Sequence, residues 1–334
     1  MKKLSVFIIG LLLIPALTLT SCDRGDDPTG GNVVATPAFD LMADYMVANN
    51  LDVNNILTNQ DGDKFVVGAP AENDLGAFLD KYYIMDIRSS DAFAASHISG
   101  AQNVAFSDIL TVAASTTKPI LVVCYTGQTA CYATALLRLY GYPKTQALKW
   151  GMSGWNSGNA GPWNSNIANI AKNSPNWTYA PAPANITFKD PVISTTLTDG
   201  EDILKERVEA VVAEGFKGVN PADVLNNPGG YFINNYFSEA DYIGFGHISS
   251  AYRILPLTLA GDSYKSLDPE AKTVITYCYT GQTSAVITAV LRVLGYDAAS
   301  LKFGMNGLYN ENPAWQSNQW GHDSKPKSLP VVGN

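Results

Sequence analysis

The hexapeptide Cys-Tyr-Thr-Gly-Gln-Thr occurs twice in this chain, at residues 124–129 and again at 278–283. Each copy follows a short apolar run and precedes small residues with helical spacing. A cysteine thiolate is a strong nucleophile, and glycine lets a loop turn successive N–H groups toward one centre. The repeat therefore predicts two nucleophilic thiols, Cys124 and Cys278, each between a strand end and a helix N-terminus.

Each predicted loop should bind an anionic sulfur species, because a helix N-terminus carries unpaired N–H groups and a partial positive charge. The expected binding residues are Tyr125, Thr126, Gly127, Gln128 and Thr129 in the first loop and Tyr279, Thr280, Gly281, Gln282 and Thr283 in the second. The same donors stabilise a thiolate. We therefore expect the pKa of Cys124 to be lowered toward the range of ~3.5–7.5 known for activated cysteines.

The elements around the loops indicate an α/β fold. Residues 82–87 and 120–124 are continuous apolar runs, typical of strands buried on both faces of a parallel sheet. Residues 129–140 repeat apolar positions at helical spacing, and further helices are predicted around 39–47 and 201–214. Strands alternating with helices predict two tandem domains, each with a central parallel sheet flanked by helices.

The internal repeat extends over most of the chain. His97-Ile98-Ser99 corresponds to His247-Ile248-Ser249, and the run 148–152 corresponds to 301–305. A chain of 334 residues also suits two domains of roughly 150 residues. The predicted organisation is a signal peptide at 1–21, a flexible tether at 22–35, a first domain at 36–178, a linker at 179–189, a second domain at 190–326 and a tail at 327–334.

The N-terminus reads as a bacterial export signal. Two lysines precede an apolar run at 6–16, which is too short for a permanent membrane span. The following Leu19-Thr20-Ser21-Cys22 resembles a lipoprotein processing site, where the cysteine carries the lipid. This resemblance implies an exported protein anchored to the bacterial membrane, periplasmic or on the cell surface. The alternative is an ordinary signal peptide followed by an unrelated cysteine.

Composition narrows the possible partners. The net charge is −8 and no basic cluster is present, which argues against nucleic-acid binding. With Cys22 assigned to the anchor, an odd number of cysteines remains, and two of them lie in the repeated loops. That distribution favours reactive thiols over a disulfide framework. No metal-ligand spacing is visible, so no metal site is expected.

Four segments in order resemble the rhodanese (sulfurtransferase) family. They are Asp86-x-Arg88 after the first strand, the turn at 96–101, the cysteine loop at 124–129 and the segment at 148–155. The resemblance implies that the thiolate attacks the outer sulfur of a sulfane donor such as thiosulfate. The resulting persulfide would pass its sulfur to a thiol or cyanide-like acceptor, without a cofactor.

The second domain departs from this pattern, because Asn235 and Phe237 occupy the places of Asp86 and Arg88. We expect the charged pair to support the first loop through hydrogen bonds, and Phe237 to pack elsewhere. Cys124 should therefore carry most of the turnover. Gln128 and Gln282 stand where several thiosulfate sulfurtransferases carry a basic residue, so the donor stays open.

Other interpretations remain beside this one. The protein could be a non-catalytic sulfur-binding or protein-interaction module at the cell envelope. A phosphatase of the related cysteine-loop kind needs an Arg where Ala130 and Ser284 stand, and is disfavoured. Three further sets each have a structural and a functional interpretation. They are Cys131 (helix packing or a resolving thiol), His97 and His247 (turn residues or bases), and Trp150 and Phe303 (core or a wall of the site).

Overall fold

The structure, a computed structural model, describes residues 36–270 and 272–333. The predicted signal peptide, the tether and Cys22 lie outside these residues. Within the described part of the chain, no helix is both long enough and apolar enough to span a membrane.

The first domain is built on a parallel five-stranded sheet in the order β1-β5-β4-β2-β3. Its strands are β1 (Val66–Val67), β2 (Tyr83–Asp86), β3 (Gln102–Asn103), β4 (Ile120–Val123) and β5 (Gln146–Leu148). Its helices are α1 (Ala38–Ala48), α2 (Val53–Leu57), α3 (Leu75–Lys81), α4 (Ser90–Ala95), α5 (Ile109–Ala113), α6 (Gln128–Tyr140), α7 (Gly151–Trp155) and α8 (Gly161–Asn164), with 3-10 turns η1 (Glu72–Asp74), η2 (Phe106–Asp108) and η3 (Ser157–Asn159). The central strand β4 is buried along its whole length, as its run of branched apolar residues predicts.

The second domain repeats this plan with a parallel sheet in the order β7-β11-β10-β8. Its strands are β7 (Gly218–Val219), β8 (Phe232–Asn235), β10 (Val274–Tyr277) and β11 (Ala298–Leu301). Its helices are α9 (Gly200–Glu214), α10 (Pro221–Asn226), α11 (Glu239–Phe245), α12 (Gln282–Val293) and α13 (Gly304–Tyr309), with 3-10 turns η4 (Pro228–Gly230) and η5 (Ser263–Ser266). The predicted fold class, two α/β domains with parallel sheets, is confirmed.

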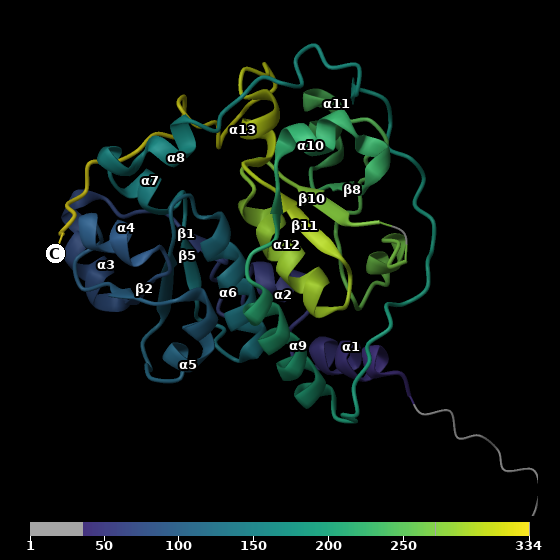
Figure 1. Cartoon of the computed structure of the whole chain (residues 1–334), viewed down its shortest axis with the longest axis horizontal. Helices are drawn as coiled ribbons and strands as arrows, with labels where there is room; N and C mark the ends of the chain where they lie inside the picture. Colours follow the sequence, from purple (N-terminus) through teal and green to yellow (C-terminus); the bar gives the residue numbers. More distant parts are fainter. Residues whose placement is uncertain (1–35, 271, 334) are drawn as a thin grey trace, which may run out of the picture. The chain divides into compact units, whose positions relative to one another are not determined.

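One apolar core joins the two domains. Helices α6 and α12, which follow the two cysteine loops, pack against each other, as do the opening helices α1 and α9 (Figure 1). The inward-facing sides of α6 and α12 are buried among apolar neighbours, and small residues such as Ala133 and Ala289 let the two helices approach closely. The carboxylate of Asp52 adds a polar contact by accepting the N–H groups of Leu259 and Ala260.

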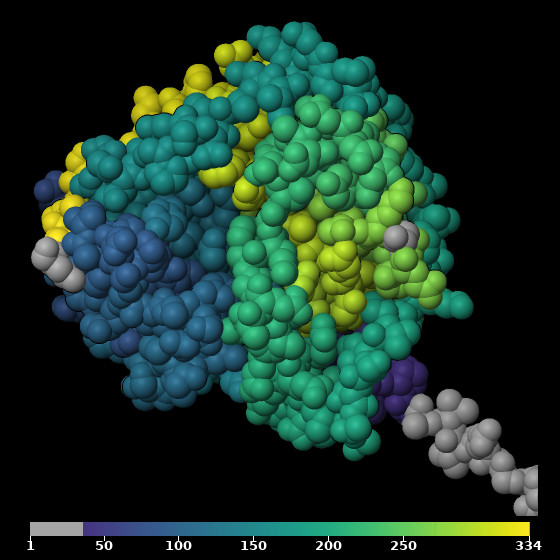
Figure 2. Space-filling model, viewed as in Figure 1, coloured from purple at the N-terminus to yellow at the C-terminus, as the bar shows by residue number. Residues whose placement is uncertain are grey.

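The C-terminal segment of each domain crosses to the other domain. Residues 166–178 lie on the second domain and end in β6 (Trp177–Thr178), which pairs with β9 (His247–Ile248). Residues 325–333 lie on the first domain, where Val332 and His97 exchange backbone hydrogen bonds of 2.8 and 2.9 Å. Figures 1 and 2 show this second crossing segment in yellow along the first domain. The two crossing segments contact equivalent turns, one containing His247 and the other His97. The internal repeat therefore includes the way in which each C-terminal segment packs on the other domain.

Candidate active site

The first cysteine loop lies at the carboxyl end of β4. Gly127, with a φ of 87°, ends the loop and begins α6. The sulfur of Cys124 accepts the backbone N–H groups of Gly127 at 3.2 Å and Ala130 at 3.3 Å. Of the loop residues expected to bind the sulfur species, Gly127 directs its N–H at the sulfur, and the second N–H comes from Ala130, which was not among them.

The second loop holds its sulfur differently. Within the described residues, one backbone N–H, that of Ser284 at 3.4 Å, is directed at the sulfur of Cys278. The Cys278 thiol also donates to the hydroxyl of Ser284 at 3.7 Å, and this hydroxyl lies 2.9 Å from that of Ser300. Identical hexapeptides thus hold two chemically different sulfur environments.

A short helix closes over each loop and binds its carbonyls. The N–H groups of Met152 and Ser153, at the start of α7, donate to the carbonyls of Cys124 and Tyr125 at 2.9 and 3.0 Å. In the second domain Met305 donates to Cys278 in the same way, also at 2.9 Å. The helix can approach the loop this closely because residue 151 is Gly: a Cβ at this position would lie 2.4 Å from the Cys124 carbonyl oxygen. Each loop is therefore fixed from its outer side by a helix N-terminus.

Burial reverses the expected direction of the Cys124 pKa. Cys124 and Cys278 are only 3% and 2% exposed. Burial raises the pKa of the Cys124 thiol, the amides of Ala130, Thr126 and Gly127 lower it in part, and the charge of Asp86 adds a small rise. The expectation of a lowered pKa is wrong, because burial outweighs the amide donors.

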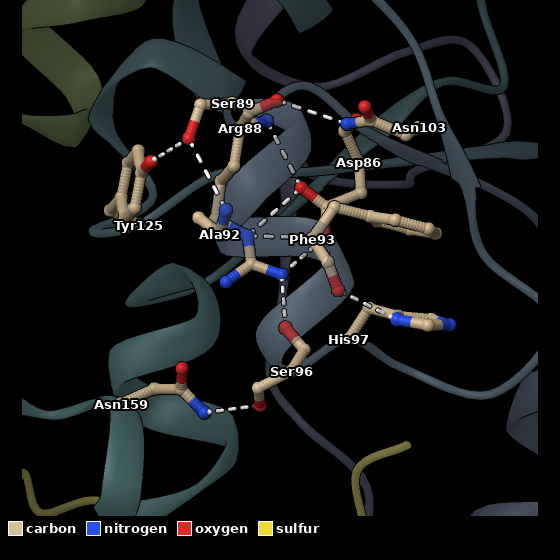
Figure 3. Close-up of polar contacts among 10 residues, drawn as sticks. All are labelled: Asp86, Arg88, Ser89, Ala92, Phe93, Ser96, His97, Asn103, Tyr125 and Asn159. Atoms are coloured by element: carbon tan, nitrogen blue, oxygen red, sulfur yellow. Dashed lines mark hydrogen bonds and ion pairs between the residues drawn. The ribbon is translucent and has the colours of Figure 1, made fainter. Parts of the chain in front are cut away.

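The predicted supporting pair, Asp86 and Arg88, forms a buried ion pair at the end of β2 (Figure 3). Arg88 Nη2 donates to Asp86 Oδ2 at 2.7 Å and to the carbonyl of Ser96 at 2.5 Å. We expected hydrogen bonds from this pair to the cysteine loop, but the hydrogen bonds of Arg88 go to Asp86 and Ser96. Arg88 instead lies against the ring of Tyr125, 5.7 Å from its centroid, so the pair supports the loop through a side chain.

The corresponding place in the second domain is aromatic. Phe237 is fully buried and stacks on the ring of Tyr279, with centroids 4.3 Å apart. It therefore takes the position of Arg88 beside the loop tyrosine, and the expectation that it packs elsewhere is wrong. Asn235 donates to the hydroxyl of Tyr277 at 2.8 Å, and that hydroxyl accepts the N–H of Ile248 at 3.2 Å.

The glutamines of the two loops reach across the domain interface. Gln282 Nε2 donates to the carbonyl of Thr126 at 3.2 Å, and Gln128 Oε1 accepts the N–H of Phe303 at 2.7 Å. Trp163 donates to the same Thr126 carbonyl at 3.1 Å. The two glutamine contacts cross between the domains, whereas that of Trp163 lies within the first domain; none of the three is predicted from the residues of one loop alone. The identity of the two hexapeptides was the available signal that they could face one another.

The remaining candidates have structural contacts. The rings of His97 and His247 stack on Phe93 and Tyr242, and the Nδ1 atoms of both histidines contact the carbonyls of these same residues. Burial lowers the pKa of His247, which favours its neutral form.

The three cysteines at 124, 131 and 278 are free, which agrees with the expectation of thiols rather than disulfides in the described chain. Cys131 is fully buried on α6, and burial raises its pKa well above the ordinary value. Trp150 and Phe303 belong to one aromatic cluster with Trp163 and Trp320, which confirms that they are core residues, while their part as a wall of the site stays a prediction.

Comparison with known proteins agrees with this geometry. Residues 71–158 and 237–311 match the rhodanese-like domain. A thiosulfate sulfurtransferase, GlpE of Pseudomonas fluorescens, is 36% identical over 75 residues, which span 22% of this chain and 68% of that protein. The chain belongs to the rhodanese-like family. It is thus a tandem member of a sulfurtransferase family, with two rhodanese-like domains.

Solved structures with low identity are also similar. A thiosulfate sulfurtransferase from Pseudomonas aeruginosa is 14% identical, with coverage of 84% of this chain and 69% of that chain and a TM-score of 0.24. The 3-mercaptopyruvate sulfurtransferase SseA from Escherichia coli is 15% identical, with coverage of 72% and 98% and a TM-score of 0.27. The family assignment therefore rests on the sequence matches.

Proposed function

We propose that this rhodanese-like protein transfers sulfane sulfur from a donor such as thiosulfate to a nucleophilic acceptor through a persulfide on Cys124. The observation that carries the proposal is the pair of N–H groups, from Gly127 and Ala130, directed at the Cys124 sulfur. Such donors stabilise a negatively charged sulfur more than a neutral thiol.

In the proposed first step, the Cys124 thiolate attacks the outer sulfur of thiosulfate. A sulfur–sulfur bond forms at Cys124, and the donor's own bond breaks with its electron pair leaving on sulfite. In the second step a thiol or cyanide-like acceptor attacks the outer sulfur of the persulfide, and Cys124 leaves as the thiolate. Before the first step the Cys124 thiol, whose pKa is raised by burial, must release its proton to solvent. Sulfite and the thiolate then leave without a general acid.

The proposal is tested by intact mass spectrometry after incubation with thiosulfate. We expect the mass to rise by one sulfur atom for each cysteine that becomes a persulfide. A thiol acceptor should remove this added mass. Cys124→Ser should remove most of this increase and Cys131→Ser none of it. Protein that takes up no sulfur from thiosulfate or another sulfane donor would contradict the proposal.

The near-complete burial of both thiols favours a second candidate function. A non-catalytic module could bind a sulfur compound, or a partner protein, without turning over. The same incubation separates the two functions, because a binding module forms no covalent adduct with a sulfane donor.

We also propose that the protein is exported and anchored to a bacterial membrane by a lipid on Cys22. The proposal is supported by the basic start, the short apolar run and the Leu-Thr-Ser-Cys ending of the first 22 residues. Cys22→Ala should release the protein from the membrane fraction and leave sulfur transfer intact. Continued membrane association of this variant would argue against the lipid anchor.

A further inference from the structure

Gln282 of the second domain contacts the backbone of the first domain's cysteine loop. Its side chain is 3% exposed, and its Nε2 donates to the carbonyl of Thr126 at 3.2 Å. The contact is tight, since a Cβ on Gly127 would lie 2.7 Å from this nitrogen. Glycine at this position therefore serves both the turn, with its φ of 87°, and the approach of the opposite domain.

The bonded carbonyl belongs to the peptide unit that also carries the N–H of Gly127. In a planar trans peptide, the C=O and the N–H point in opposite directions. Gln282 and Trp163 both hold the Thr126 carbonyl on the side away from Cys124. The N–H of Gly127 is thereby directed at the Cys124 sulfur, 3.2 Å away.

We propose that Gln282 is a positioning residue for the sulfur site of the opposite domain, acting through the Thr126–Gly127 peptide. Its catalytic consequence rests on the proposed function, whereas its effect on the Cys124 thiolate does not. Without the side-chain donor, the peptide can rotate and withdraw one of the N–H groups from the sulfur. A complete sulfur site in the first domain thus requires the second domain.

Each loop glutamine contacts the opposite domain, but the two contacts act on different parts of the sulfur sites. Gln128 Oε1 accepts the N–H of Phe303, which immediately precedes α13. Helix α13 in turn donates to the carbonyl of Cys278. Gln128 therefore acts on the segment that closes the second loop, while Gln282 acts on an amide that contacts the first sulfur directly.

The test is the pH dependence of Cys124 labelling by iodoacetamide, followed peptide by peptide in the full chain without any sulfur donor. Gln282→Met preserves side-chain length but removes the donor. We expect the labelling midpoint of Cys124 to rise by about one pH unit, which makes labelling near neutral pH about tenfold slower. The other titratable groups near this thiol, Asp86 and Cys131, are unchanged in the variant.

Gln146→Met is the matched control. Gln146 is also a buried glutamine with two hydrogen bonds, to Tyr82 and to the carbonyl of Lys64, but it lies at the opposite end of the sheet's strands from the loop. Its substitution should leave the Cys124 midpoint unchanged. Trp163→Phe removes the other donor to the Thr126 carbonyl and should raise the midpoint as Gln282→Met does.

The direction of the shift separates positioning from packing. If Gln282 only held the domains together, its loss would expose Cys124, lower the labelling midpoint and speed the reaction. A lower or unchanged midpoint in Gln282→Met would overturn the proposal, as would an equal rise in Gln146→Met. If Gln282→Met does not fold, an unchanged midpoint in Trp163→Phe overturns it. Because no sulfur donor is present, failure of the proposed sulfur transfer cannot produce any of these outcomes.

Discussion

The two cysteine loops of this rhodanese-like protein have the same six residues and different surroundings. In the first loop two backbone N–H groups contact the sulfur, and an Arg lies against the loop tyrosine. In the second loop, within the described residues, the sulfur contacts one backbone N–H and a serine hydroxyl, and a Phe stacks on the tyrosine. The repeated sequence therefore preserves the shape of the loop, while residues outside it decide how each sulfur is held.

The difference arises at two places. The residue that follows the hexapeptide is Ala130 in one loop and Ser284 in the other. The Ser284 hydroxyl accepts a hydrogen bond from the Cys278 thiol, a contact that Ala130 cannot make. The residue beside the loop tyrosine is Arg88 or Phe237. An amide favours the charged form of sulfur, whereas a hydroxyl that accepts the S–H favours the neutral thiol. This comparison makes the first loop the better persulfide site.

The largest expected effect is on turnover. Cys124→Ser should remove most of the steady-state sulfur transfer, because the first sulfur has the fuller set of amide donors. Cys278→Ser should remove a minor share. The two single variants, assayed with the same donor and acceptor, measure this ratio directly. Loss of activity in Cys278→Ser with most activity kept in Cys124→Ser would reverse the assignment.

The next effect is on stability and concerns the charged pair. Asp86 is fully buried, so Arg88→Met leaves its carboxylate without its charged partner, with only the backbone N–H of residue 88 still donating to it. We expect the free energy of unfolding to fall by about 3–5 kcal/mol, measured by denaturant titration.

The second domain supplies the control for this variant. The double substitution of Asp86→Asn with Arg88→Phe copies Asn235 and Phe237 and buries no unpaired charge. It should cost clearly less than Arg88→Met alone. An equal or larger loss in the double variant would show that packing, and not the unpaired charge, dominates at this position.

A smaller effect follows from the raised pKa of Cys124. The thiolate is disfavoured in the folded protein, so labelling of Cys124 should rise about tenfold per pH unit through and above the free-cysteine value of about 8.5. The same shift affects stability. The contribution of the buried neutral thiol is fully present below the unfolded pKa and is lost as the pH rises through the folded pKa. A labelling midpoint well below about 8.5 would mean that the amide donors outweigh burial after all.

The sequence predicts the elements well because their signals are local. The buried strands β2 and β4, the helices α6 and α12 and the position of both cysteine loops follow from apolar runs, small residues and glycines near each element. A strand end, a Gly in a left-handed conformation and a helix N-terminus predict N–H groups near each sulfur. The second loop shares these three features but directs one N–H at its sulfur within the described residues, so the local pattern does not determine the full set of donors.

The errors share one cause, which is contact with residues distant in sequence. The pKa of Cys124 rises because the folded chain buries it, and the contacts of Gln128 and Gln282 exist only across the interface. Arg88 and Phe237 each found a partner in the loop tyrosine, which neither spacing nor composition indicates. Leu329, in the segment named as a tail, is buried on the first domain, another contact with residues distant in sequence. The predicted domain limits remain a prediction, to which the structure adds that both C-terminal segments cross over.

The smallest expected effect concerns Cys131, the one described cysteine outside the hexapeptides. The second domain carries Ala285 at the corresponding position of α12, so Cys131→Ala makes the first domain resemble the second at this one site. We expect a change of about 1 kcal/mol or less in the free energy of unfolding and no change in sulfur transfer. A resolving thiol would attack the Cys124 persulfide, and its loss would lengthen the lifetime of that persulfide. Single-turnover transfer to a thiol acceptor, compared between the wild-type protein and Cys131→Ala, measures this lifetime. Equal lifetimes would leave Cys131 as a packing residue, consistent with its complete burial and raised pKa, and would confine the chemistry to the two loops.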